Sequence, residues 1–134
     1  MREPLTTTRL MTRPETFQQG VLGLVEHKSD TIYVDPATHR YRGQLYCHLF
    51  SNDIEALHAF AARLGLKHEW FQKPPKASWM HYDTNFRNRI NAIQLGAVAV
   101  DKFEIILVAH RQRGTLTQEI IEKVAYSRSL RRKS

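Results

Sequence analysis

The chain has 134 residues, a formal net charge of +7 and a sequence pI of about 9.9. This length suits one compact domain, and a hydrophobic fraction of 42% excludes a globally disordered chain. Cys47 is the single cysteine, which excludes a disulfide framework and a multi-cysteine zinc site and favours the reducing cytoplasm. No apolar run reaches the length of a membrane span, so we expect a cytoplasmic protein without a membrane segment.

The predicted organisation has three parts. Residues 1–19 read as a flexible basic arm, residues 20–126 as a single small α/β domain, and residues 127–134 as a basic tail. We expect the domain to contain a short mixed or parallel sheet that is covered by helices. The sequence carries no signal for an oligomeric state.

Three segments have the patterns of strands. Residues 31–35 are rich in β-branched side chains and end before Pro36. In residues 44–50, alternation places Cys47 on an apolar face and His48 on the opposite, aromatic face, so Cys47 is expected in the core. Residues 97–100 form a short apolar strand after a helix, which indicates a βαβ crossover to a buried position. Residues 37–43 are expected to form a polar loop.

Four helices are expected, near residues 52–64, 84–95, 102–113 and 116–128. Asn52 followed by Glu55 fits a capping box at the start of the first helix, and Asp83 or Thr84 is the expected N-cap of the second. The apolar residues of the second helix recur at helical spacing and are expected to face the core: Phe86, Ile90 and Ile93.

Familiar catalytic motifs are absent from the sequence. It contains no Gly-rich phosphate loop, no dinucleotide fingerprint and no Gly-x-Ser-x-Gly nucleophile elbow. It also lacks a His-Glu-x-x-His motif, zinc-finger spacings and an RNA-recognition signature. A functional site must therefore be assembled from side chains that are scattered along the chain.

The stretch from residue 46 to residue 83 holds most of the candidates for such a site. His48 lies on the second strand, His58 on the following helix, and His81 and Asp83 precede the next helix, while Asp35 ends the first strand. Three of them have a purely structural alternative of their own. Asp35 can open an Asx turn, His58 can be a hydrogen-bonded core residue, and Asp83 can cap a helix.

At this point the ordered set of motifs resembles a known family of small phage and bacterial proteins, called domain of unknown function four thousand thirty-one, over about residues 31–100. The segments that carry the resemblance are Tyr33-Val34-Asp35, Cys47-His48-Leu49, the run from Glu55 to Gly65, Trp70-Phe71-Gln72, His81-Tyr82-Asp83 and Gln94-Leu95-Gly96-Ala97-Val98. The resemblance implies a phage or prophage accessory protein and no established catalytic residues.

The resemblance also adds one candidate and weakens one role. Tyr82 looks characteristic of the family, as do Asp35, His81 and Asp83 with the histidines of the strand and the helix. Pro36 stands where the family often has an acidic residue, which argues against a paired-carboxylate role for Asp35.

The candidate chemistry has two forms. Two or three imidazoles with a carboxylate suit a divalent transition metal ion, for which the candidate ligands are His48, His58, His81 and Asp83. The same groups without a metal can act as general acid and base on a phosphodiester. We therefore predict a small phosphodiester-directed hydrolase whose catalytic candidates are His48, His58, His81, Asp83, Asp35 and Tyr82.

A basic, non-enzymatic module is the alternative function. Its partner would be nucleic acid, a nucleotide or an acidic host protein. The candidate contact residues are Arg40, Arg42, Lys73, Lys76, Arg87, Arg131 and Arg132. A third possibility is that the histidines only hydrogen-bond within the core and that the function lies elsewhere.

Overall fold

The computed structural model describes residues 27–133, so the predicted N-terminal arm lies outside the described residues. Residues 28–116 form one compact unit, and the last helix, α5 (Gln118–Lys133), belongs to a second unit that is treated by itself. α5 extends past its predicted end at residue 128, because the arginines and lysine that follow are good helix formers.

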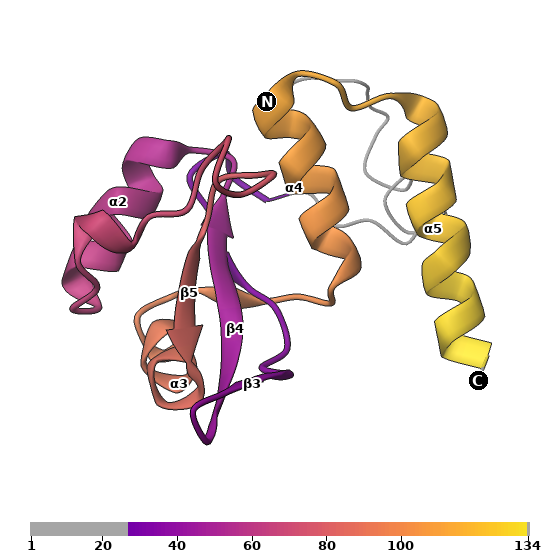
Figure 1. Cartoon of the computed structure of the whole chain (residues 1–134). Coiled ribbons are helices and arrows are strands. Elements are labelled where there is room, and N and C mark those ends of the chain that lie inside the picture. The colour runs from indigo at the N-terminus through magenta and orange to yellow at the C-terminus, as the bar shows by residue number, and fades with distance from the viewer. Residues whose placement is uncertain (1–26, 134) are drawn as a thin grey trace. The chain divides into compact units, whose positions relative to one another are not determined.

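The first unit is built on a mixed, five-stranded sheet, and Figure 1 labels its strands β3, β4 and β5. Its strands are β2 (Ile32–Val34), β3 (His39–Tyr41), β4 (Gln44–Ser51), β5 (Tyr82–Asn85) and β6 (Val98–Ala99). The long strand β4 pairs antiparallel with β2, β3 and β5, and β6 pairs parallel with β2. This arrangement confirms the predicted α/β class. Two strands were not predicted. β3 lies in the segment that was expected to be a polar loop, and β5 lies where the start of a helix was expected.

The helices of this unit are α2 (Ile54–Arg63), the short 3₁₀ helix η1 (His68–Trp70), α3 (Phe86–Gln94) and α4 (Phe103–Arg113). Two predicted caps are wrong by one or two residues. Asp53, not Asn52, accepts the N–H of Ala56 at the start of α2, and Asn85 accepts the N–H of Asn88 at the start of α3. The sequence offers adjacent cap-forming residues at both places, so composition alone did not decide between them.

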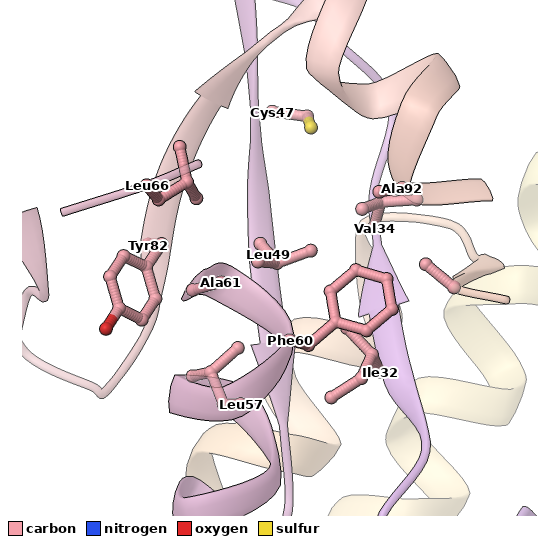
Figure 2. Packing of buried hydrophobic residues seen from close by; sticks show 11 residues of the cluster. Ile32, Val34, Cys47, Leu49, Leu57, Phe60, Ala61, Leu66, Tyr82 and Ala92 are labelled. Atoms are coloured by element: carbon pink, nitrogen blue, oxygen red, sulfur yellow. The ribbon is translucent and has the colours of Figure 1, made fainter. Parts of the chain in front are cut away.

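The two faces of the sheet carry different layers. On one face, α2 and α3 cover an apolar cluster that includes Val34, Leu49 and Tyr82 from three neighbouring strands. Figure 2 shows Leu49 of β4 within this cluster, in register with Val34 on one side and Tyr82 on the other. Cys47 is buried in the same cluster, as predicted.

The opposite face of the sheet contacts α4. Tyr33 and Phe50 point to this face and form a second buried cluster with Trp79 and with Val108 and Ala109 of α4. Strand alternation explains the division, because successive side chains point to opposite faces. His48 lies between Cys47 and Leu49 and therefore shares the face of Phe50.

The apolar stripe of α3 faces away from the core. Phe86, Ile90 and Ile93 recur at helical spacing, but they are exposed, and Ala92 is the residue of α3 that is buried against the sheet. The prediction that this stripe is buried was therefore wrong. The small side chain of Ala92 allows the helix to approach the strands closely. The opposite side of α3, which carries Phe86, Ile90 and Ile93, therefore faces solvent.

The chain from β5 through α3 to β6 forms the predicted crossover, but β6 is not buried. Val98 is half-buried and Ala99 is exposed, because β6 pairs with β2 alone and ends the sheet. Across residues 27–133, no helix combines the length and the apolarity needed to span a bilayer.

Candidate metal centre

Backbone pairing between β4 and β5 brings the first two side chains of the site together. His48 lies directly opposite Asp83 in the antiparallel register. Trp79, His81 and Asp83 alternate along the extended chain that leads into β5, so they point to the same face as His48. The backbone of His81 is held by two hydrogen bonds to Gln72, at 2.8 and 3.0 Å.

Asp35 fixes the orientation of the His48 ring. It follows β2 and is buried, and its carboxylate accepts the backbone N–H of His48 at 2.6 Å and the Nδ1–H of the same residue at 2.9 Å. A carboxylate offers only acceptors here, so Nδ1 carries the proton. The second ring nitrogen, Nε2, is thereby left as an unprotonated ligand atom in the neutral ring.

His81 is held in the same tautomer by a different group. Its Nδ1 lies 3.2 Å from the backbone carbonyl oxygen of Trp79, which can only accept a hydrogen bond, and its ring stacks on the Trp79 indole with centroids 4.3 Å apart. Nε2 of His81 therefore points away from the core, and it lies 3.4 Å from Oδ1 of Asp83. Nε2 of His48 lies 3.9 Å from the same oxygen.

These contacts bring three possible metal-ligand atoms close together. One ligand atom from each of His48, His81 and Asp83 lies within 4.8 Å of the other two. Two imidazole lone pairs and a carboxylate oxygen repel one another unless a cation lies between them. The cation can be a proton on an imidazole or a metal ion, and both would be stabilised at this place.

The electrostatics of the site follow from the same contacts. Burial lowers the pKa of His48, but the hydrogen bond to Asp35 and the charges of Asp35 and Asp83 outweigh burial, so the net pKa is raised above 6.5. When Nε2 of His81 is also protonated, its hydrogen bond to Asp83, together with the positive charge of the histidines around it, holds the pKa of Asp83 below its usual range despite partial burial. Asp83 is therefore an ionised carboxylate at neutral pH.

The exposure of the three groups leaves an open side. The side chain of Asp83 is 48% exposed, whereas those of His48 and His81 are 19% and 8% exposed. A zinc ion with ligand bonds of about 2.0–2.1 Å places neighbouring ligand atoms roughly 3.3 Å apart in a tetrahedron. The 3.4 Å separation between Nε2 of His81 and Oδ1 of Asp83 fits that spacing. Nε2 of His48 lies farther out, 3.9 Å from the same oxygen, and the three ligand atoms spread over as much as 4.8 Å, so a tetrahedral ion would draw His48 inward.

A glutamine that sequence reasoning missed supports this side of the site. The side-chain amide of Gln112 on α4 accepts the backbone N–H of Met80 at 2.8 Å and donates to the Met80 carbonyl at 2.9 Å. It thus completes both backbone hydrogen bonds of the residue between Trp79 and His81. Gln112 lies more than thirty residues along the chain from Met80, and its sequence neighbourhood carries no signal for such a contact.

His58 and Tyr82, two further predicted site residues, lie on the other face of the sheet. Nδ1 of His58 is 2.8 Å from the Tyr82 hydroxyl, and Tyr82 points to the face opposite to that of Asp83. The His58 ring also contacts the rings of His68 and Phe71, with centroids 4.5 Å away in each case. The structure therefore does not bring His58 or Tyr82 to His48 and His81.

Cys47 has no reactive role in this geometry. It points into the core, and burial raises the pKa of its thiol to about 12, so the thiolate needed for nucleophilic attack is not formed near neutral pH.

The predicted basic contact residues fall on separate parts of the chain. Arg40 and Arg42 are exposed on the hairpin of β3 and β4, Lys73 and Lys76 are exposed before Trp79, and Arg87 is exposed on α3. Arg131 and Arg132 belong to α5 and thus to the other unit.

Comparison with known proteins gives one match. The family model described as "Protein of unknown function (DUF4031)" matches residues 32–112, which is more than half of the chain and includes Asp35, His48, His81 and Asp83. The match confirms the resemblance drawn from the sequence motifs. No curated protein and no solved structure gives a significant match.

Proposed function

Because the chain belongs to the family described as "Protein of unknown function (DUF4031)", a description that names no activity, we propose a function from the chemistry of the site. His48, His81 and Asp83 bind a divalent transition metal ion, and the metal centre hydrolyses phosphodiesters. The observation that carries the proposal is the convergence of two imidazole Nε2 atoms and a carboxylate oxygen within 4.8 Å.

The groups behind the ligands favour a metal over an ordinary ion pair. In metal sites, a ligating histidine typically donates its other ring N–H to a carboxylate or a backbone carbonyl, which fixes the tautomer and increases the basicity of the ligand. His48 has the carboxylate of Asp35 as this partner, and His81 has the carbonyl of Trp79. Two histidines and one carboxylate with these supports form a typical ligand set for zinc, iron or manganese.

His48, His81 and Asp83 would hold the ion, and the exposed side of Asp83 would admit water and substrate to it. A divalent ion lowers the pKa of bound water toward neutrality, which supplies a nucleophile for attack at phosphorus. In the hydrolysis itself, a water oxygen would form a new P–O bond, the ester oxygen would leave with its electron pair and take up the proton that the water gives up, and the products would be a phosphomonoester and an alcohol. The formal charge of +7 favours an anionic substrate of this kind.

Metal titration tests the first half of the proposal. Chelator-treated protein is titrated with Zn²⁺ and Mn²⁺ by calorimetry, and we expect one site per chain in the wild type. His48→Ala, His81→Ala and Asp83→Asn should each lose that site. His58→Ala is the matched control, because it removes a hydrogen-bonded histidine from the opposite face of the sheet and should leave the stoichiometry unchanged.

Cleavage of bis(4-nitrophenyl) phosphate by the metal-loaded proteins tests the second half. Activity in the wild type and in His58→Ala, with loss in the three ligand variants, is the expected result. Wild-type protein that binds no metal would overturn the metal centre. Protein that binds the metal but cleaves no phosphodiester, or ligand variants as active as the wild type, would overturn the hydrolase.

A further inference from the structure

The hairpin formed by β3 and β4 lies next to the candidate metal centre and is not explained by it. Strand register places His39 opposite Tyr46 and Tyr41 opposite Gln44. Because Tyr46 and His48 are two residues apart on one strand, the side chains of His39 and Tyr41 share the face of His48. The ring of His39 lies 5.2 Å from that of His48, edge to face.

The hairpin presents an exposed aromatic ring among positive charges. Tyr41 is 58% exposed, although a large apolar ring at this position contributes nothing to the core. The centroid of its ring lies 6.1 Å from that of Tyr46, with the two rings nearly perpendicular, and the guanidinium of Arg42 lies 5.4 Å from the Tyr41 centroid. Arg40 is exposed between His39 and Tyr41, and no acidic residue occurs between Asp35 and Asp53.

The turn itself contains an unfavourable residue. Arg42 and Gly43 both have positive φ, 50° and 79°, and form the two-residue connection between β3 and β4. This is the backbone pattern of a type I′ turn, for which Asn-Gly is preferred because a larger side chain is strained at the first position. An arginine there places a cation at the tip of the hairpin at a cost to the backbone.

From this juxtaposition we propose that the β3–β4 hairpin binds single-stranded nucleic acid and guides its backbone to the metal centre. Tyr41 stacks on an unpaired base, and Arg40 and Arg42 contact the phosphates beside it. The proposal rests on the proposed function, because it names the substrate class of the same site. Single strands are favoured over duplexes because an exposed aromatic ring can stack only on bases that are not already stacked and paired.

The alternation of β3 supplies the path from the hairpin to the site. Tyr41 and His39 lie two residues apart on one face, which is about 7 Å along a strand, and His39 is the ring next to His48. A strand whose base stacks on Tyr41 can therefore continue past His39 toward the ligand cluster. A base-stacking residue and phosphate-contacting arginines beside a metal centre together suit a polynucleotide better than a small phosphoester.

Fluorescence anisotropy with a labelled single-stranded oligonucleotide tests the proposal. Binding is measured in EDTA, so that no metal-dependent cleavage occurs, with ssDNA, ssRNA and a duplex of the same sequence as separate arms. Tyr41→Ala should weaken single-strand binding about 5- to 100-fold, which corresponds to the loss of one stacked base. Arg42→Asn should also weaken binding and reduce its salt dependence by about one phosphate contact, while restoring the preferred turn residue.

The controls separate hairpin recognition from charge alone and from the metal. Arg63→Gln on α2 removes one exposed cation elsewhere and should leave binding unchanged. Three results would overturn the proposal. Tyr41→Ala could bind the single strand as tightly as the wild type, or the wild type could bind duplex and single strand equally. The third is an Arg63→Gln effect as large as that of Arg42→Asn. A wild type that binds no metal would sink the proposed function but would not alter these affinities, so the two failures are distinguishable.

Discussion

Replacement of Asp35 by asparagine tests how His48 is prepared as a ligand. Asp35 accepts two hydrogen bonds from the same residue, one from the backbone N–H and one from Nδ1–H of the ring. An asparagine has one oxygen and one NH₂ group. We expect the oxygen to keep the backbone N–H and the NH₂ group to donate to Nδ1 of the ring.

This exchange reverses the tautomer of His48. With Nδ1 accepting a hydrogen bond, the ring proton moves to Nε2, where it points to Asp83 and prevents coordination. Loss of the carboxylate partner of a ligating histidine weakens metal binding by about 10- to 100-fold, or roughly 1.4–2.7 kcal/mol. Asp35→Asn should reach at least that loss.

The stability of the metal-free protein should change much less in Asp35→Asn than in Asp35→Ala. Asparagine keeps both hydrogen bonds but loses their charge assistance, which costs about 1–2 kcal/mol. Alanine leaves the buried backbone N–H of His48 without an acceptor and adds its desolvation penalty, for a total of roughly 3 kcal/mol or more.

Urea unfolding of chelator-treated protein and calorimetric titration with Zn²⁺ measure the two effects separately. An Asp35→Asn variant that binds zinc as tightly as the wild type would show that Asp35 does not set the tautomer of His48. If Asp35→Asn and Asp35→Ala are destabilised equally, the hydrogen bond from the backbone N–H of His48 to residue 35 does not stabilise the fold. Asp83→Asn provides the contrast, since an exposed carboxylate should affect zinc binding while changing apo stability by about 1 kcal/mol or less.

Two further predictions concern the supports on either face of the sheet. Burial and the neighbouring His68 lower the pKa of His58 below 6.5, so its neutral form stabilises the fold above about pH 6.5 and this contribution is lost as the pH falls below that value. Urea unfolding should therefore show a larger difference in unfolding free energy between wild type and His58→Asn at about pH 7.5 than at about pH 5.5. A difference that grows on acidification would contradict this prediction. Gln112→Ala should cost about 1–3 kcal/mol by leaving the Met80 N–H without an acceptor, and should accelerate hydrogen exchange at that amide more than Gln112→Glu, which keeps the acceptor. Equal exchange in the two variants would show that Gln112 does not hold this segment.

Local periodicity was sufficient for the half of the site that lies on regular elements. The alternation of β4 assigned His48 and Cys47 to opposite faces, and the position of Asp35 at the end of β2 placed it near the site. Both predictions depend only on the two-residue repeat of a strand and on a proline that ends it. The fold class followed from the same patterns.

The second half of the site was obscured by overlapping signals. Asp83, Thr84 and Asn85 precede a helix, and all three are cap-forming residues, so the sequence suggested an early N-cap. The structure uses Asn85 as the cap and extends the chain before it as β5. That choice depends on pairing with β4, which is a long-range contact that local propensity does not encode.

The position of His58 shows a different limit. Its helical spacing correctly indicated a stripe directed at the sheet, and four histidines in one stretch suggested one site. A helical period says which side of a helix is covered but not which face of a sheet covers it. Likewise, the stripe of Phe86, Ile90 and Ile93 has the correct period, yet α3 contacts the strands through Ala92.

The alternation of a single strand separates the two groups of histidines and gives each a distinct role. Tyr82 and Asp83 are adjacent on β5, so their side chains lie on opposite faces of the sheet. The Tyr82 hydroxyl is within hydrogen-bond distance of His58 beside the apolar core, and the Asp83 carboxylate lies near Nε2 of His48 and of His81 on the other face. The ligand atoms therefore come from paired or bridged backbone rather than from loops, which restricts their movement. Backbone pairing thus holds His48, His81 and Asp83 side by side on one face of the sheet, where a cation, either a proton on an imidazole or a metal ion, would offset the charge of the carboxylate.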